Sequence, residues 1–167
     1  MAMAEQEATE GFWLRDSRDL LKKLRWELEN LFCRQRHDVE ACEYLAYNCA
    51  VTAWHVSDWL FEDIPDELRR SRGWKTLSDF QQFIRSECSA LTLCWASANA
   101  SKHRRVKTTA VRVSDGEGHG YGNPIIVDGT QRHDASAVFW EALRWYEDFL
   151  QSEGILLDEP FVPLGDQ

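Results

Sequence analysis

One long stretch of the chain, residues 38–61, is apolar on nearly every side when it is drawn as a helix. Large apolar side chains run through it and leave no continuous polar face: Tyr44, Leu45, Tyr47, Val51, Trp54, Val56, Trp59 and Leu60. Because such a helix must be covered by its neighbours, the stretch predicts a helical protein with this helix at its centre. Its few polar residues are then the ones to explain, since a buried polar group costs free energy unless it has a partner.

A second interior helix is predicted over residues 89–101. Small side chains dominate this stretch and allow neighbouring helices to approach closely: Ala90, Ala96, Ser97, Ala98, Ala100 and Ser101. We expect this helix to lie beside the first interior helix. Its end differs in character, because a polar and basic run accompanies it: Asn99, Lys102, His103, Arg104, Arg105 and Lys107.

Three amphipathic helices are predicted around these two. Residues 12–34 and 78–87 repeat apolar side chains at spacings of three and four, which places them on one face of a helix. In the first of these helices the apolar face consists of Trp13, Leu20, Leu24, Leu28, Leu31 and Phe32. Asp134 is predicted to cap the last helix, which ends near Glu153. The buried face of the last helix is expected to consist of Val138, Phe139, Ala142, Leu143, Tyr146, Phe149 and Leu150.

The segment before the last helix changes from the period of a helix to that of a strand. Residues 106–113 alternate in character, a turn with glycines at 116, 118, 120 and 122 follows, and residues 125–127 are apolar. This order predicts a β-hairpin within residues 105–130. The glycines do not predict a phosphate-binding loop, because neither a Gly-Lys-Ser/Thr signature nor a helix follows them. Earlier in the chain, residues 64–73 are predicted to be a polar connector with a second basic cluster, Arg69, Arg70 and Arg72.

These elements define one fold and one domain. The chain is predicted to be mainly α, an up-and-down bundle of four or five helices with a β-hairpin inserted before the last helix. The bundle domain is expected to span residues 12–154, with a flexible N-terminal tail at 1–11 and a C-terminal tail at 155–167. A chain of 167 residues is long enough to bury a core without disulfides or a structural metal.

Composition disfavours several classes of protein. With 28 acidic and 19 basic residues the formal net charge is -9, which opposes general binding to nucleic acids and to anionic membranes. Because of this charge we expect no DNA partner. We also expect no membrane association, since no stretch has the pattern of a signal peptide or a membrane span. The five cysteines have no paired spacing and are expected to be free, as in a cytoplasmic protein.

The polar residues of the first interior helix form one half of a candidate site. At 100° per residue, Asn48, Thr52 and His55 fall on one side of this helix. Asp58 is one turn beyond His55, where a carboxylate can orient an imidazole and favour its protonated form. These four side chains are therefore expected to lie together in the interior.

The second interior helix supplies the other half. Asn99, Lys102 and His103 are separated by three and four residues and share one face. Side-by-side helices would bring this cluster and the polar side of the first helix into one pocket. Zinc or iron is not expected there, because the Glu-x-x-His spacings of metal sites in helical bundles are absent around His55, Asp58 and His103. We therefore predict no metal and no other cofactor.

Metal-independent cleavage of RNA is the reaction that these residue types fit best. A histidine can take the proton from a 2′-hydroxyl or give one to the leaving oxygen, and His103 is assigned this role. Cations such as Lys102 and Arg104 can balance the charge that develops on the phosphate in the transition state. The residues expected to orient the reacting groups are Asn99, His55 and Asp58. The remaining substrate-binding candidates are Arg104, Arg105, Lys107, Asn48 and Thr52.

The bundle and the sequence ASANASKH resemble the HEPN family, small bacterial and archaeal helical bundles that include ribonuclease toxins and nucleotide-binding partners. The family's motif places an Arg, a polar residue and a His on one helix, with four to six residues between the Arg and the His. Asn99 and His103 match the polar residue and the His, whereas the positions for the Arg hold the small residues Ala96, Ser97 and Ala98. The combination of NCAVTAWHVSDW and ANASKH is also similar to uncharacterised bacterial helical proteins.

The resemblance implies a ribonuclease toxin or a nucleotide-binding member of a bacterial defence or toxin–antitoxin system, with RNA or a nucleotide as its partner. The missing Arg leaves a second function open: a non-catalytic structural or interaction bundle that works as an oligomer or as a subunit of a partner. In that case His103 and Lys102 only cap a helix C-terminus, where cations interact favourably with the helix dipole. The oligomer is then expected to form through the last helix and the tail. The sequence alone does not decide whether the chain is an enzyme.

Overall fold

The computed structural model describes residues 14–34, 39–102, 112–114 and 124–155. Six helices and three short strands make up this part of the chain. In sequence order they are α1 (Ser17–Arg34), α2 (Val39–Asp63), α3 (Asp66–Arg72), α4 (Leu77–Glu87), α5 (Ser89–Lys102), β1 (Arg112–Ser114), β2 (Ile125–Asp128), β3 (Gln131–Asp134) and α6 (Ala135–Ser152). The prediction of a mainly α fold with a hairpin before the last helix is confirmed.

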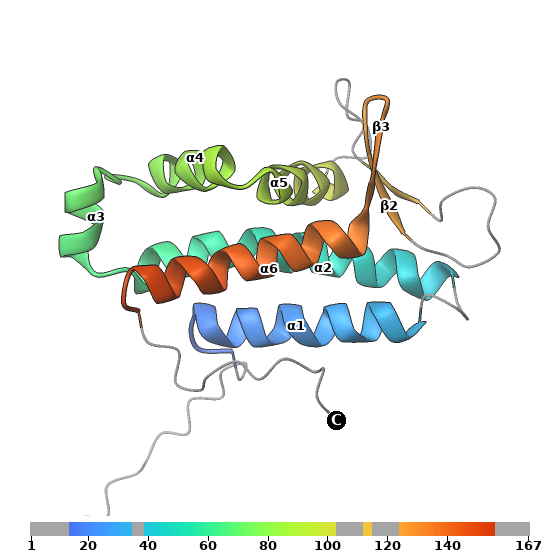
Figure 1. The fold of residues 1–167 in the computed structure, drawn as a ribbon, viewed down its shortest axis with the longest axis horizontal. Helices are drawn as coiled ribbons and strands as arrows, with labels where there is room; N and C mark the ends of the chain where they lie inside the picture. The colour runs from blue at the N-terminus through green and yellow to red at the C-terminus, as the bar shows by residue number, and fades with distance from the viewer. Residues whose placement is uncertain (1–13, 35–38, 103–111, 115–123, 156–167) are drawn as a thin grey trace, which may run out of the picture.

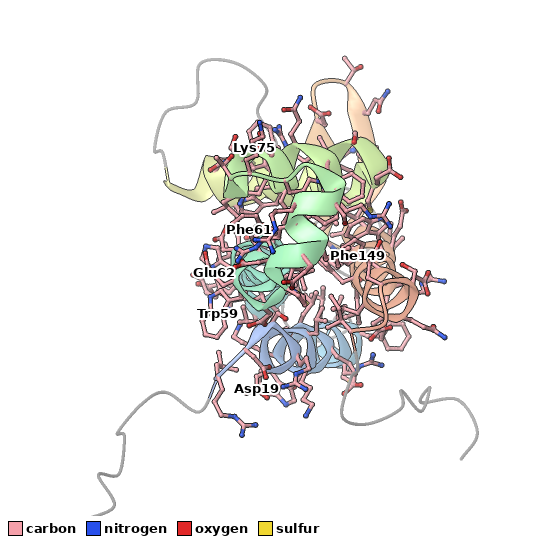
Figure 2. The ribbon with its side chains drawn as sticks, turned by 90° about the vertical axis from the view of Figure 1, so that its left-hand side faces the viewer. Asp19, Trp59, Phe61, Glu62, Lys75 and Phe149 are labelled. Atoms are coloured by element: carbon pink, nitrogen blue, oxygen red, sulfur yellow. The ribbon has the colours of Figure 1, made fainter. Side chains whose placement is uncertain are left out.

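Four long rods form an up-and-down bundle (Figure 1). α1 and α2 lie side by side in opposite directions, α4 and α5 follow one another as a single interrupted rod, and α6 returns beside them. Seen along the rods, α1, α2, the α4–α5 rod and α6 surround one core (Figure 2). α6 also contacts α1, so the bundle is closed on all sides.

The third rod is broken at Cys88, whose backbone is extended, with φ -136° and ψ 109°. Its first half, α4, begins with a capping box: Thr76 Oγ1 accepts a hydrogen bond from the Asp79 N–H at 3.2 Å, and the Asp79 carboxylate accepts one from the Thr76 N–H at 2.8 Å. The predicted start of this helix is Ser78. The cap is Thr76 instead, because the acidic partner of a capping box stands three residues after the cap.

The core has one end of large side chains and one of small ones. Five rings pack together beside α3: Trp74, Phe80, Phe83, Trp145 and Phe149. The ring centroids of Trp74 and Phe83 are 4.8 Å apart. Further along the bundle the buried residues of α2 and α5 are mostly small: Ala46, Cys49, Ala50, Ala53, Cys94, Ser97 and Ala98. The predicted small-residue contact between these two helices is therefore present.

α6 agrees with its prediction residue by residue. Asp134 caps it by accepting a hydrogen bond from the Ala137 N–H at 2.9 Å. All seven predicted members of its buried face are buried: Val138, Phe139, Ala142, Leu143, Tyr146, Phe149 and Leu150. Gly154, with a φ of 67°, follows the helix in the left-handed conformation that commonly ends one.

Two elements differ from the prediction. Residues 66–72, predicted to be part of a polar connector, form the helix α3, which has no buried residue. The predicted hairpin becomes a three-stranded antiparallel sheet in the order β1-β2-β3, because residues 131–134 return beside β2. Ile126 in the central strand is fully buried, so the sheet contributes to the core.

Candidate functional site

The polar residues of α2 point toward different neighbours. Thr52 is buried, and its hydroxyl accepts a hydrogen bond from Lys23 Nζ of α1 at 2.6 Å. Asp58 turns toward α4, where its carboxylate accepts a hydrogen bond from Gln81 Nε2 at 2.6 Å. Gln81 also donates to the buried hydroxyl of Ser57 at 3.1 Å. Each of these polar groups therefore ties α2 to a neighbouring helix.

The remaining side of α2 is open to solvent. Tyr44 and Trp59 expose 60% and 36% of their surface, Asn48 is exposed and His55 is half-buried. These four positions fall on one side of the helix, and Figure 2 shows Trp59 on this outer side together with Glu62. The expectation that α2 is covered all round is therefore wrong. Asn48 and His55 lie on or beside its open side, not in a buried pocket.

Asn99 lies along the seam between α2 and α5. One turn before it, the Trp95 ring packs edge-on against Trp54 of α2, with ring centroids 6.5 Å apart. The guanidinium carbon of Arg85 lies 4.4 Å from the centroid of Trp95. His55, next to Trp54, is thus close to the level of Trp95, and Asn99 is about 6 Å further along the axis. Successive residues of a helix point about 100° apart, so the His55 side chain lies on the open side of α2 with Tyr44 and Asn48 and not on the side of Trp54. The contacts of the described residues do not join His55 to Asn99.

The remaining candidates, on α5 and after it, are only partly within the described residues. Lys102 is the last residue of α5, about 10 Å beyond Trp95 along the helix, and its side chain is not among those described. Since α2 runs in the opposite direction, this level corresponds to Tyr47 and not to His55. Four candidates lie outside the described residues: His103, Arg104, Arg105 and Lys107.

The basic cluster of residues 64–73 is not a free anion-binding patch. Three ion pairs engage its arginines: Asp66–Arg69, Glu67–Arg70 and Arg72–Glu153. Arg69 also donates to the Phe61 carbonyl at 3.3 Å and lies over the Phe61 ring. These contacts hold α3 against α2 and α6, which gives the arginines a structural role.

A buried charged group that the sequence analysis misses lies between α1 and α2. Glu27 is only 3% exposed; its Oε1 accepts a hydrogen bond from Lys23, and its Oε2 has no hydrogen-bond partner among the described residues. Burial, and after it the nearby Glu27 carboxylate, raises the pKa of the Cys49 thiol. The sequence does contain the signal, because Glu27 is one turn from Leu24 and Leu31 and so shares their apolar face.

Exposed aromatic residues gather on α1 and α2. In addition to Tyr44 and Trp59, the exposed large apolar side chains of the described residues are Trp26 and Phe32, at 61% and 66%. Trp26 is one turn after Lys23 and Trp59 is two turns after Thr52, so both flank the contact between α1 and α2. We call the surface formed by Trp26, Tyr44, Asn48, Trp59 and Glu62 the α1–α2 outer face.

Phe32 lies off this face. It is two turns after Arg25, which pairs with Glu147 of α6, so Phe32 belongs to the side of α1 turned toward α6. The prediction that Phe32 belongs to the buried face of the first helix is wrong. The four leucines of the same prediction, Leu20, Leu24, Leu28 and Leu31, are buried.

Neither metal chemistry nor known relatives identify the site. Within the described residues no three His, Cys, Asp or Glu side chains are grouped so that they could hold a metal ion. None of the helices in the same part of the chain has the length and apolar character needed to cross a membrane. No protein-family model, curated protein or solved structure matches the chain. Its function must therefore be inferred from its own surface and core.

Proposed function

We propose that this protein is a helical interaction module that binds another protein chain through the α1–α2 outer face. The supporting observation is that three aromatic side chains, Trp26, Tyr44 and Trp59, are exposed on one face of two neighbouring helices. Trp and Tyr are enriched among the residues that dominate the energetics of protein interfaces. Covering them with a partner removes apolar surface from water, which is favourable by about 25 cal/mol per Å².

The last helix is a weaker candidate for this contact than the sequence analysis expects. Its exposed residues are polar, charged or small: Ala137, Glu141, Arg144, Asp148, Gln151 and Ser152. Its large side chains are turned into the core or are half-buried. The interface is therefore placed on α1 and α2.

Site-specific photo-cross-linking in cells of the source organism tests this proposal. A photoreactive phenylalanine analogue replaces Trp59 on the outer face or, as a matched control, Arg144 on the exposed side of α6. We expect a cross-linked adduct of defined mass from position 59 and none from position 144. No adduct from position 59, or the same adducts from both positions, would contradict an interface at the outer face.

A second candidate function is a HEPN-like ribonuclease or nucleotide-binding protein of a toxin–antitoxin or defence system. It is supported by the half-buried Trp95 ring at the contact between α2 and α5, one turn before the half-buried Asn99. An aromatic ring offers a surface on which a nucleobase can stack. The basic residues that follow Asn99 in the sequence supply cations for phosphate. Because the chain is acidic overall, such a site would have to be local.

The test of the second candidate compares RNA cleavage and toxicity to the host for the wild type, His103→Ala and Asn99→Ala. Circular dichroism confirms that the variants are folded. If the protein is such an enzyme, the wild type is expected to cleave RNA and the His103→Ala variant is expected not to. Equal activity of wild type and His103→Ala, or no activity from either, would remove the ribonuclease function.

A further inference from the structure

We infer that the C-terminal segment, residues 156–167, folds back along the contact between α1 and α6 and places Phe161 over Phe32 and Trp140. This segment lies outside the described residues. Three observations support its placement: an exposed ring beside that contact, the point at which the segment begins, and its reach. The surface differs from the α1–α2 outer face, so the inference does not depend on the interaction proposed there.

An exposed apolar surface lies beside the α1–α6 contact, at the end of the bundle nearest the sheet. Phe32 exposes 66% of its surface, the largest fraction among the large apolar side chains of the described residues. Arg25 of α1 pairs with Glu147 of α6, and the two helices are antiparallel (Figure 1). Phe32 is two turns after the arginine, and the half-buried Trp140 is two turns before the glutamate. The two aromatic residues are therefore level, and both lie on the side where the ion pair forms.

The C-terminal segment begins close to this contact. The Ile155 N–H donates to the Leu150 carbonyl at 2.9 Å, and the Gly154 N–H donates to the Gln151 carbonyl at 3.2 Å. With Gly154 at a φ of 67°, these bonds form a Schellman motif, in which an apolar residue at the position of Ile155 commonly packs on the one at Leu150. Ile155 does pack against the core. Leu150 lies one turn beyond the α6 carboxylate that pairs with α1, so the chain leaves α6 on the side of α1.

The sequence of the segment favours an extended chain with apolar side chains to cover. Residues 156–167 read LLDEPFVPLGDQ and contain five large apolar side chains: Leu156, Leu157, Phe161, Val162 and Leu164. Pro160 and Pro163 disfavour the α conformation of the residues before them. An extended chain of this kind rises about 3.1 Å per residue. If the segment stayed in water, these side chains would remain exposed, which is unfavourable.

The reach of the segment matches the position of the two rings. Trp140 lies twelve residues before Ser152, the last residue of α6, which is about 18 Å along the helix. Phe161 follows Ile155 by six residues, which is about 19 Å of extended chain. A segment that runs back along α6 therefore brings Phe161 to the level of Trp140 and Phe32.

The tether favours this segment over a separate partner on the same surface. Five residues join Ile155 to Phe161, and a short linker gives an effective concentration of roughly millimolar. Contact between Phe161 and Phe32 removes apolar surface of both rings from water. The segment thus keeps Phe32 from other chains, whereas the α1–α2 outer face stays open to them.

Disulfide trapping in the full chain tests this placement. In a Cys33→Ser background, Phe161→Cys is combined with Phe32→Cys or, as the matched control, with Trp26→Cys. Trp26 is similarly exposed, at 61%, and lies nearer to the end of α6, but it points about 120° away from Phe32 around α1. We expect mild oxidation to link positions 32 and 161 within one chain at least about tenfold faster than positions 26 and 161.

Two outcomes of this experiment would overturn the inference. Equal rates, or faster linkage at position 26, would contradict it, because a segment without a fixed place meets the nearer position more often. A disulfide between two chains would also contradict it. Such a product would run on a non-reducing gel at twice the 19.4 kDa of one chain, and it would assign the segment to a second copy.

Urea denaturation gives an independent test without new cysteines. If Phe161 covers Phe32, then Phe32→Ser and Phe161→Ser should each lower the urea midpoint. The double variant should lose less than the sum of the two, because the first change already removes the contact. Trp26→Ser is the control, and its effect should be the same with and without Phe161→Ser. Additive losses, or an unchanged midpoint in Phe32→Ser, would overturn the contact.

Discussion

Glu27 is a carboxylate on the leucine-lined face of α1, and Lys23 is the side chain that compensates its charge. Without Lys23 the carboxylate loses the cation that pairs with it, and its Oε2 already has no partner among the described residues. We expect Lys23→Met to lower the free energy of unfolding by roughly 3 kcal/mol. Lys22→Met, at an exposed neighbouring position, should change it by less than about 0.5 kcal/mol. Urea denaturation measures both changes in the free energy of unfolding. Equal losses would show that the Lys23–Glu27 pair contributes no more to stability than an exposed lysine does.

The cysteines differ sharply in their surroundings. Cys33 is exposed, whereas Cys42, Cys49, Cys88 and Cys94 are buried. We expect an aromatic disulfide reagent to modify one thiol rapidly in the native protein and the other four only on unfolding. Absorbance of the released thiolate measures the two phases. Cys33→Ser should abolish the fast phase alone, and a fast phase of more than one thiol would contradict the packing described here.

Thiol burial also gives a pH dependence with a definite sign. Burial raises the pKa of Cys49, Cys88 and Cys94 above the usual 9.0. Because the folded-state pKa is the higher one, this contribution to stability is complete below pH 9 and is lost as the pH rises above it, where the thiols of the unfolded chain ionise. The free energy of unfolding is therefore expected to fall above pH 9 less steeply in Cys49→Ala than in the wild type. Parallel curves would contradict this assignment.

Among the elements, the buried side of a helix could be predicted where the helix has one polar face, as in α6, and not where it has none, as in α2. α6 alternates apolar and charged sides, so its buried residues follow from spacing alone. α2 offers no such contrast, because its open side is marked by Tyr44 and Trp59, which the sequence analysis reads as core. The prediction of the candidate site is wrong for the same reason, because it treats the polar residues of α2 as one buried group. Thr52 and Asp58 were expected to share a pocket, but the choice of neighbouring helix sends them to α1 and α4.

Short elements depend on local contacts that hydrophobic patterns do not reveal. α3 buries no residue and is held by ion pairs such as Glu67–Arg70, at 3.2 Å. β3, with the sequence QRHD, has no apolar alternation and forms because a two-residue turn after Asp128 brings it beside β2. Neither element could be predicted from apolar periodicity.

The capping box of α4 gives a prediction at the scale of one helix. Thr76→Ala removes the hydroxyl that accepts the Asp79 N–H, which should lower the free energy of unfolding by about 1 kcal/mol. Ser78→Ala alters an exposed residue inside the same first turn and serves as the control. Chemical denaturation of the two variants compares them. A larger loss of stability for Ser78→Ala would indicate that Ser78, and not Thr76, caps the helix.

At the scale of the whole molecule, the sheet is part of the bundle. Ile126 is fully buried, and its strand contacts α5. Ile126→Ala should therefore lower the free energy of unfolding by roughly 3 kcal/mol and keep a single transition. Val127→Ala, at a half-buried neighbouring position, should cost less than about 1 kcal/mol. A separate early transition in thermal unfolding would mean that the sheet folds independently.

Which rods become neighbours is a property of the whole chain. Lys23 and Thr52 are 29 positions apart, and only the fold makes them partners. The five longer helices and the place of the hairpin follow from local patterns, whereas the outer face follows from this pairing. The sequence predicts the bundle, but the surface on which its function is proposed emerges only when α1 and α2 are placed side by side.

The tryptophans of the described residues occupy unlike environments. Trp26 and Trp59 are in contact with water, whereas Trp74 is enclosed by other rings. An indole in water emits at longer wavelengths than one in an apolar medium. The protein therefore contains its own optical reporters: a shift of its emission toward the blue, without any change in helix content, would signal that Trp26 and Trp59 have been shielded.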